Sequence, residues 1–131
     1  MKSKVYLAGG MNSNWQKKII DELSDQFIFF NPSEHKLDDV KEYKVWDLYY
    51  VKNCDILFGY MEKSNPSGYG LALEIGYAKA LNKLIILVDE RSHSDATFHK
   101  NFKFIQLTSD IYFNKIEDGI TMLSSMCRGI K

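Results

Sequence analysis

The strongest constraint on the fold is an uninterrupted apolar run at residues 84–88, made of leucine, isoleucine and valine. Leucine and β-branched residues in a short run favour a strand. A strand with no apolar–polar alternation is buried on both faces, which is typical of a parallel sheet covered by helices. The run therefore predicts an α/β protein.

The rest of the chain alternates between strand-like and helix-like segments. Short apolar runs predict further strands at residues 5–8, 26–30, 54–59 and 104–107. Helical spacing predicts one helix that begins at residues 12–14 and three further helices at 43–52, 71–81 and 114–126. We interpret residues 33–42 as a solvated loop or an irregular helix, and residues 89–103 as a loop. This order predicts a flavodoxin-like or Rossmann-like three-layer sandwich, with a mostly parallel sheet of about five strands.

Size and charge exclude several classes of protein. The 131 residues, 45% of them hydrophobic, fit a single domain over residues 1–131. Lys plus Arg equals Asp plus Glu at 17 each, so no overall field attracts a nucleic-acid polymer or an anionic membrane. No apolar run approaches the roughly 18 residues of a membrane span, and the first residues do not resemble a signal peptide. Cys54 and Cys127 are not a disulfide framework, so we expect a cytoplasmic protein.

A turn-rich loop at residues 65–70 leads into the helix predicted at 71–81. Gly68 and Gly70 leave no side chain over the helix entrance, so a ligand can approach the backbone closely. Glu74 follows in or just after the first turn, where free N–H groups and the helix dipole favour an anion. We expect this carboxylate to stay ionised and to face a small molecule. The alternative is that Glu74 merely suits the start of a helix.

A second glycine loop, Gly9 and Gly10, follows the first predicted strand. Ligands of open α/β sheets bind beyond the carboxyl ends of the strands, so both glycine loops border one crevice if the first and third strands are neighbours. Tyr6 and Asp55 reach that crevice only if their side chains lean towards the strand ends. Tyr6 is otherwise a core side chain, whereas Asp55 at the head of an apolar strand needs a partner.

Several common sites are absent from the sequence. It contains neither the Gly-x-Gly-x-x-Gly dinucleotide motif nor a phosphate-binding P-loop, and no Gly-x-Ser-x-Gly elbow. His35, His93 and His99 lack the paired spacing of zinc ligands, so we expect no metal site. What remains is carboxylate chemistry on a sugar, in which a glutamate attacks the anomeric carbon and a second acceptor resolves the glycosyl ester.

Aromatic side chains accompany the candidate carboxylate. Tyr6 could hold Glu74 in place through its hydroxyl group, and Trp15, Trp46 or Tyr69 could stack on a base. Trp15 and Trp46 also have the spacing of core or interface residues on their helices.

Three stretches resemble the nucleoside 2-deoxyribosyltransferase family and its relatives, the nucleotide N-hydrolases. In the family's order they are VYLAGGM at residues 5–11, NCDIL at 53–57 and GLALEIGYAKALNK at 70–83. The glutamate block with its upstream glycine is the specific part. The resemblance implies a flavodoxin-like homo-oligomer whose neighbouring subunit completes the site, and it implies no metal or organic cofactor.

The resemblance also implies roles for single residues. Glu74 corresponds to the nucleophile, Tyr6 orients it, and Asp55 belongs to the region that binds or protonates the base. Transferases of the family commonly have an aspartate six residues before the nucleophile, where this chain has Gly68. The asparagine that a neighbouring subunit supplies in the transferases has only a loose match here, Asn101.

The monophosphate hydrolases instead have a serine near that point and polar residues after the first glycine. Ser67, offset by one position, and Asn12 with Ser13 are the corresponding residues here. The predicted substrate-binding residues are thus Gly9, Gly10, Asn12, Ser13, Trp15, Ser67, Gly68 and Gly70.

The sequence thus predicts an enzyme that cleaves or transfers at the N-glycosidic bond of a 2′-deoxynucleoside, through a covalent glycosyl-glutamate intermediate. One alternative is a 2′-deoxynucleoside 5′-monophosphate N-hydrolase. The other is a non-catalytic nucleotide-binding module, because a fold does not guarantee its chemistry.

Overall fold

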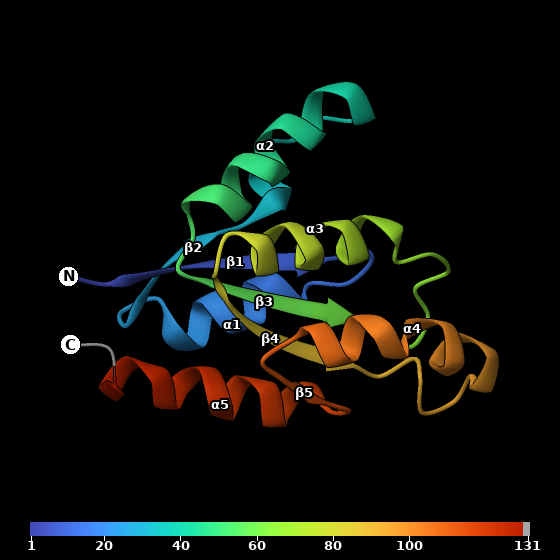
Figure 1. Cartoon of the computed structure of the whole chain (residues 1–131). Helices are drawn as coiled ribbons and strands as arrows, with labels where there is room; N and C mark the ends of the chain where they lie inside the picture. Colours follow the sequence, from blue (N-terminus) through green and yellow to red (C-terminus); the bar gives the residue numbers. More distant parts are fainter. Residues whose placement is uncertain (130–131) are drawn as a thin grey trace.

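The computed structural model describes residues 1–129 and shows a three-layer α/β sandwich (Figure 1). The sheet has five strands in the order β2-β1-β3-β4-β5, and every neighbouring pair is parallel. This strand order is the flavodoxin-like one, so the predicted fold class is confirmed. The strands are β1 (Ser3–Gly9), β2 (Phe27–Phe30), β3 (Ile56–Met61), β4 (Leu84–Asp89) and β5 (Ile111–Phe113).

Helices cover both faces of the sheet. On one face lie α1 (Trp15–Leu23) and α5 (Ile116–Gly129), and on the other α2 (Val40–Asn53), α3 (Tyr69–Ala80) and α4 (Ala96–Thr108) (Figure 1). A 3-10 helix, η1 (Pro32–Glu34), connects β2 to α2.

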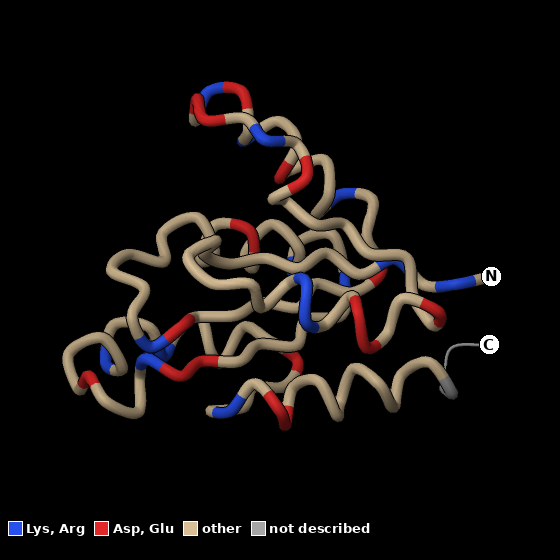
Figure 2. Tube along the Cα trace, turned by 180° about the vertical axis from the view of Figure 1, so that it is seen from behind, with Lys and Arg blue, Asp and Glu red and all other residues tan. Residues whose placement is uncertain are grey.

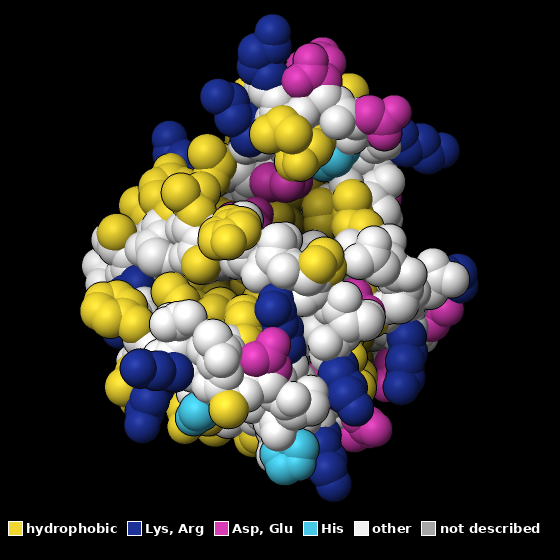
Figure 3. Space-filling model, turned by 90° about the vertical axis from the view of Figure 1, so that its right-hand side faces the viewer, with side chains coloured by type: hydrophobic (Ala, Val, Ile, Leu, Met, Phe, Trp, Pro, Cys, Tyr) yellow, Lys and Arg dark blue, Asp and Glu magenta, His cyan; other side chains and the backbone are white. Residues whose placement is uncertain are grey.

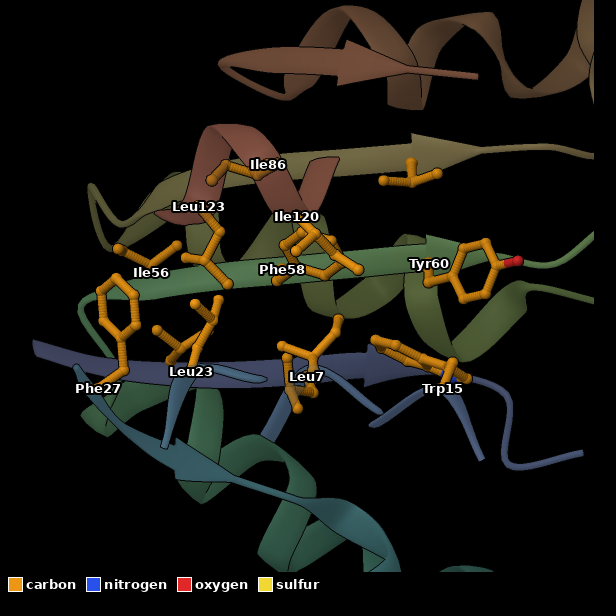
Figure 4. Packing of buried hydrophobic residues seen from close by; sticks show 13 residues of the cluster. Leu7, Trp15, Leu23, Phe27, Ile56, Phe58, Tyr60, Ile86, Ile120 and Leu123 are labelled. Atoms are coloured by element: carbon orange, nitrogen blue, oxygen red, sulfur yellow. The ribbon is translucent and has the colours of Figure 1, made fainter. Parts of the chain in front are cut away.

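The central strands are buried on both sides, as the apolar run predicted. Side chains of one face, such as Leu7, Phe58 and Ile86, pack against Ile120 and Leu123 of α5 (Figure 4). Successive residues of a strand point to opposite faces. Tyr6 therefore lies in the other cluster, with the residues of α2, α3 and α4. This alternation directs the Tyr6 hydroxyl towards α3.

The predicted fifth strand at residues 104–107 is wrong, because these residues lie within α4. The helix begins at Ala96, inside the segment that the sequence predicted to be a loop. Asp95 caps it, since its carboxylate accepts the N–H of Phe98 at 3.0 Å. Phe98 and Phe102 then follow at helical spacing and stack with ring centroids 4.7 Å apart.

The true fifth strand, β5, has only three residues and pairs with the end of β4. So short a strand shows no alternation from which it could be recognised.

Most other boundaries differ from the prediction by a few residues, and two of these differences affect the surroundings of the site. α2 starts at Val40 rather than at residue 43, because Asp39 caps it by accepting the N–H of Lys41 at 2.9 Å. β3 runs to Met61 rather than ending at residue 59, which places Glu62 directly at its carboxyl end.

Charges of both signs are distributed along the described chain, with a mixed group at the start of α2 and in the segment before it (Figure 2). Within residues 1–129, no helix combines the length and the hydropathy that crossing a membrane requires.

Candidate active site

A cavity of about 500 Å³ opens at the carboxyl ends of β1 and β3. The two glycine loops, the segment between β2 and α2, and the start of α3 form its walls. Figure 3 faces this edge of the sheet and shows a hollow beneath the charged end of α2, with acidic side chains in it. In the flavodoxin-like order this is the point where the strand order reverses, which is where ligands bind. The first and third strands are neighbours in the sheet, as the site prediction required.

Most of the predicted site residues line this cavity. They are Tyr6, Gly9, Gly10, Asn12, Ser67, Gly68, Gly70 and Glu74. Residues from widely separated positions in the chain thus meet at one edge of the sheet.

Glu74 and Tyr6 form a buried hydrogen bond across the interface of β1 and α3. The Tyr6 hydroxyl donates to Glu74 Oε2, and Glu74 is only 8% exposed. Burial and then the neighbouring Glu74 charge raise the pKa of Tyr6 well above its ordinary value. Tyr6 therefore keeps its proton and stays a donor to the carboxylate.

The prediction that the helix dipole keeps Glu74 ionised is wrong. α3 begins at Tyr69, so Glu74 lies in the second turn, beyond the free N–H groups of the first. Burial raises the pKa of Glu74 to about 8; the Tyr6 hydrogen bond opposes this, and the Asp47 charge adds to it.

Asp47, a carboxylate that the sequence did not single out, lines the same cavity from α2. His35 Nδ1 accepts the N–H of Leu37 at 3.2 Å, so its Nε2 carries the proton and lies 3.2 Å from Asp47 Oδ1. Burial raises the pKa of Asp47, and the His35 hydrogen bond opposes this rise. Two carboxyl groups with raised pKa values therefore share the cavity.

A signal for Asp47 was present in the sequence. It stands three and four residues before Tyr50 and Val51, which are the buried residues of α2, so it lies on the same face of the helix. His35 stacks on Tyr43 with an interplanar angle of 5°, and both line the cavity. The segment before α2, interpreted as solvated, in fact borders the site.

Asp55 does not reach the cavity, and its predicted place in the site is wrong. It precedes β3 at the amino end of the sheet, whereas the cavity lies beyond the carboxyl end. Its exposed carboxylate accepts the N–H of Lys4 at 2.8 Å. The partner that this residue needed is thus the start of β1, and its role is structural.

Trp15 and Ser13 also lie outside the cavity lining, contrary to the prediction. Trp15 packs in the core edge-on against Tyr60, with ring centroids 5.1 Å apart, and its Nε1 donates to Gly10 O at 2.8 Å. It therefore supports the first glycine loop from beneath and offers no surface for a base. Ser13 is exposed to solvent and does not line the cavity.

The loop between β3 and α3 is fixed by a single arginine. Arg91 Nη1 donates to Asn65 O at 2.7 Å and to Ser67 O at 3.3 Å, and its guanidinium group lies 4.0 Å from the ring centroid of Phe98. Gly68 has φ +96°, and a Cβ there would stand 2.2 Å from Met61 Cε, so only glycine fits. The loop is therefore a rigid wall of the cavity.

Potential metal ligands are not clustered in the described part of the chain. Within residues 1–129, no group of three or more His, Cys, Asp or Glu side chains is arranged to hold a metal ion. Burial raises the pKa of Cys54 to about 11, so its thiol is not a reactive nucleophile.

Together these features define a flavodoxin-like protein with a cavity at its strand-reversal point that carries two buried or half-buried carboxyl groups, those of Asp47 and Glu74. The family model described as "Nucleoside 2-deoxyribosyltransferase like" matches residues 2–92. The chain therefore belongs to the nucleoside 2-deoxyribosyltransferase-like family, and the family and enzyme class predicted from the sequence are confirmed. The match extends from β1 past the end of β4 and so includes every residue that lines the cavity.

Solved structures share the fold, among them these three. A 2-desoxiribosyltransferase from Leishmania mexicana has a TM-score of 0.57 at 18% identity, over 67% of this chain and 65% of that one. The CMP N-glycosidase BcmB of Clostridium botulinum has a TM-score of 0.59 at 22% identity, over 93% of this chain and 98% of that one. A conserved protein from Enterococcus faecalis V583 has a TM-score of 0.58 at 19% identity, over 94% of this chain and 88% of that one.

The chain thus spans only 65% of the length of the Leishmania protein, but nearly all of the Clostridium one. No curated protein sequence gives a significant match.

Proposed function

We propose that this protein cleaves the N-glycosidic bond of a 2′-deoxynucleoside, or of its 5′-monophosphate, through a glycosyl ester on Glu74. The observation that carries the proposal is the buried Tyr6–Glu74 pair in a cavity that also contains Asp47. Family membership supports the same chemistry.

In the first step, an oxygen of the Glu74 carboxylate attacks C1′ of the sugar. Tyr6 holds Oε2, which leaves Oε1 for the new ester bond. The C1′–N bond breaks, and its electron pair goes to the nitrogen of the base. Glu74 must be ionised to react, and the Tyr6 hydrogen bond favours that form.

The departing base needs a proton, and Asp47 is placed to supply one. Burial raises its pKa above the ordinary value of an aspartate, and Oδ2, which is free of the bond that joins Oδ1 to His35, is the oxygen that would carry the transferred proton. Asp47 thereby takes the role that the sequence assigned to Asp55. Because the Asp47 charge helps to raise the pKa of Glu74, the free protein holds the proton on Glu74. The productive form, with Glu74 ionised and Asp47 protonated, therefore requires that this proton pass from Glu74 to Asp47 when the substrate binds, and the two groups titrate as a coupled pair.

In the second step, water or another base attacks C1′ of the glycosyl ester. The ester C–O bond breaks and returns the Glu74 carboxylate, while the proton of the nucleophile passes to Asp47. Water gives hydrolysis, and a second base gives transfer of the deoxyribosyl group.

A nucleotide N-hydrolase is the nearest alternative. Asn12 and Ser67 line the cavity, and Ser67 lies directly before the amino end of α3, where backbone N–H groups favour an anion such as a 5′-phosphate. A non-catalytic nucleotide-binding module is the other alternative, and Gly68 in place of the transferases' aspartate favours it. Tight binding of a nucleotide without any turnover would identify such a module.

We also propose that a second copy of this chain covers the outer face of α2 and α3 next to the cavity. Both helices supply cavity residues and also expose large apolar side chains, and hydrophobic side chains gather beside the hollow in Figure 3. The exposed large apolar residues on these helices are Val40, Val45, Trp46, Tyr49, Tyr69 and Leu73. Exposed apolar patches of this kind mark interaction surfaces.

One assay tests the proposed function and separates it from its alternatives. The protein is incubated with the common 2′-deoxynucleosides and their 5′-monophosphates, with and without a second free base, and the products are separated by chromatography. We expect release of the base in wild type and none in Glu74→Gln, with Glu22→Gln on the exposed face of α1 as the matched control. Retained turnover in Glu74→Gln would refute the proposal.

A further inference from the structure

The Asp47 carboxyl group is held by one side chain, that of His35, which lies between β2 and α2. His35 Nε2 lies 3.2 Å from Asp47 Oδ1, and among residues 1–129 no lysine or arginine forms an ion pair with this carboxyl group. Only 4% of the His35 side chain is exposed, against 21% for Asp47. The carboxyl group is therefore the more accessible member of the pair.

The chain around His35 fixes the position and the tautomer of its ring. Asn31 caps the 3-10 helix η1, and His35 follows this helix directly. Lys36 then has φ 53°, a left-handed conformation that is uncommon outside glycine and often found at functional sites. Next to it, the N–H of Leu37 meets His35 Nδ1 at 3.2 Å. Because Nδ1 accepts this bond, Nε2 carries the ring proton and donates to the carboxyl group.

A second contact orients the plane of the His35 ring. The ring stacks on that of Tyr43, with centroids 6.2 Å apart and an angle of 5° between the planes. Tyr43 lies one helical turn before Asp47 on α2, so both residues share one face of this helix. The same helix thus carries the carboxyl group and the aromatic ring that orients its partner.

We propose that His35 is a positioning residue, which holds the Asp47 carboxyl group so that Oδ2 is presented to the departing base. The inference rests on the proposed function, in which Asp47 supplies the proton. An aspartate without such a bond rotates among staggered χ1 positions. Proton transfer requires the acid within hydrogen-bond reach of the base, so fixing Oδ1 keeps Oδ2 where it can react.

Two other roles for His35 lead to different expectations. As the acid itself, His35 would have to release the proton that it donates to Asp47, while its other ring nitrogen stays bonded to Leu37. As a stacking surface for the base, it would act on substrate binding. Both roles are independent of Asp47. A positioning residue acts only through Asp47, so its removal has no effect where residue 47 is not an acid.

The test varies how much the departing base needs a proton. One pair of substrates is 2′-deoxyuridine and its 5-nitro derivative, whose base leaves as a stabilised anion. The other pair is 2′-deoxyguanosine and its 7-methyl derivative, whose cationic base leaves as a neutral molecule. All four are supplied as nucleosides and as 5′-monophosphates, and kcat and KM for base release are measured. In each pair, only the natural member depends on the acid.

The variants separate the hydrogen bond from the bulk of the ring. His35→Phe keeps a ring to stack on Tyr43 but removes both nitrogens, and His35→Gln keeps a donor. Asp47→Asn removes the acid, and a double variant combines it with His35→Phe. His99→Phe is the matched control, because it makes the same substitution at an exposed histidine of α4. Melting temperatures establish that the variants are folded.

We expect His35→Phe to lower kcat for the natural substrates by about a hundredfold with little change in KM, because a misplaced acid slows the reaction and not binding. The activated derivatives should be cleaved nearly as by wild type. His35→Gln should retain part of the lost activity. Asp47→Asn should show the same dependence on the base, and the double variant should be no slower than Asp47→Asn. His99→Phe should behave as wild type.

An equal loss of kcat on the natural and activated members would overturn the inference, since His35 would then support the fold as a whole. A loss that persists in the Asp47→Asn background would overturn it too, because His35 would then act on the substrate directly. If Asp47→Asn depends on the base and His35→Phe does not, this inference alone fails. If wild type releases no base from any of these substrates, the proposed function fails and the inference with it.

Discussion

At the scale of single residues, Glu74 is subject to two opposing requirements. Glu74 must be buried on α3 to accept the hydrogen bond from Tyr6, which favours its ionised form. The same burial raises the pKa of Glu74 to about 8, which favours its protonated form. From this pKa, only about a tenth of the carboxyl groups are ionised at neutral pH before a substrate changes the surroundings. Tyr6 and Asp47 then act in opposite directions on this fraction.

We therefore predict that Glu74 titrates near pH 8 and that its two neighbours shift it in opposite directions. Tyr6→Phe removes a hydrogen bond that favours the carboxylate, so the pKa should rise. Asp47→Asn removes a negative charge, so the pKa should fall. NMR titration of protein with 13C-labelled glutamate side chains measures both shifts, and movement of the two variants in the same direction would be inconsistent with the site.

Stability should depend on pH through the same group. The pKa of Glu74 is raised from 4.5 to about 8 by folding, so the folded state binds the proton more tightly than the unfolded state does. The stabilisation that protonated Glu74 contributes is complete below 4.5 and is lost as the pH rises to about 8. We expect Glu74→Gln to unfold in urea like wild type near pH 4.5 but to be more stable by about 1–3 kcal/mol above pH 8. An unchanged difference between the two pH values would contradict the raised pKa.

The single residues of the site were only partly predictable from the sequence. Glu74 and the glycines follow from a loop that leads into a helix, which is a local pattern. Asp47 and Asp55 were confused because their positions depend on which end of a strand or face of a helix meets the cavity.

At the scale of elements, the loop between β3 and α3 depends on a residue from beyond β4. Arg91 joins it through the carbonyl groups of Asn65 and Ser67 and is itself held over Phe98. The strand order, rather than the sequence between the two segments, makes this contact possible.

We predict that Arg91→Ala releases this loop while the rest of the fold persists. Hydrogen exchange at residues 65–68 should accelerate, and the KM for a nucleoside should rise by about tenfold, because the wall of the cavity is no longer fixed. Arg91→Lys should have a smaller effect in the same direction, since a lysine keeps the charge but lacks the planar fork. Amides of α1, on the opposite face of the sheet, are the internal control. Unchanged exchange in the loop would show that Arg91 does not hold it.

The elements differ in how much of them the sequence could reveal. The buried strands were predicted because their apolar runs are nearly uninterrupted, and α3 was predicted because Leu71, Ile75 and Ala78 recur at helical spacing. α4 was missed because Phe104, Ile105 and Leu107 also fit a short strand, although the cap at Asp95 and the helical spacing of Phe98 and Phe102 indicate a helix. β5 is three residues long and can be recognised as a strand only from its pairing with β4.

At the scale of the whole molecule, α2 and α3 have two different faces. One face packs on the sheet and contributes Asp47 and Glu74 to the cavity, while the other exposes the apolar residues proposed to meet a second copy. A partner bound there would lie next to the open side of the cavity.

We predict that Leu73→Glu, on the exposed face of α3, converts a dimer into a monomer. A buried charge without a partner at an interface costs several kcal/mol, whereas on the surface of a monomer it costs little. Sedimentation velocity measures the change in assembly, and base release should fall with it if the partner completes the site. Leu107→Glu, on the exposed face of α4, is the matched control. Wild type that sediments as a monomer at all concentrations would contradict the proposed assembly.

The most direct test of the account is to capture the bond between Glu74 and the sugar. A nucleoside with fluorine at the 2′ position destabilises the oxocarbenium-like transition states and slows the second step, so the glycosyl-enzyme accumulates. Peptide mass spectrometry after this incubation should find the fluorosugar on Glu74 in wild type and nowhere in Glu74→Gln. An enzyme that releases base from the natural nucleoside but carries the label on another residue, or none at all, would contradict the central claim.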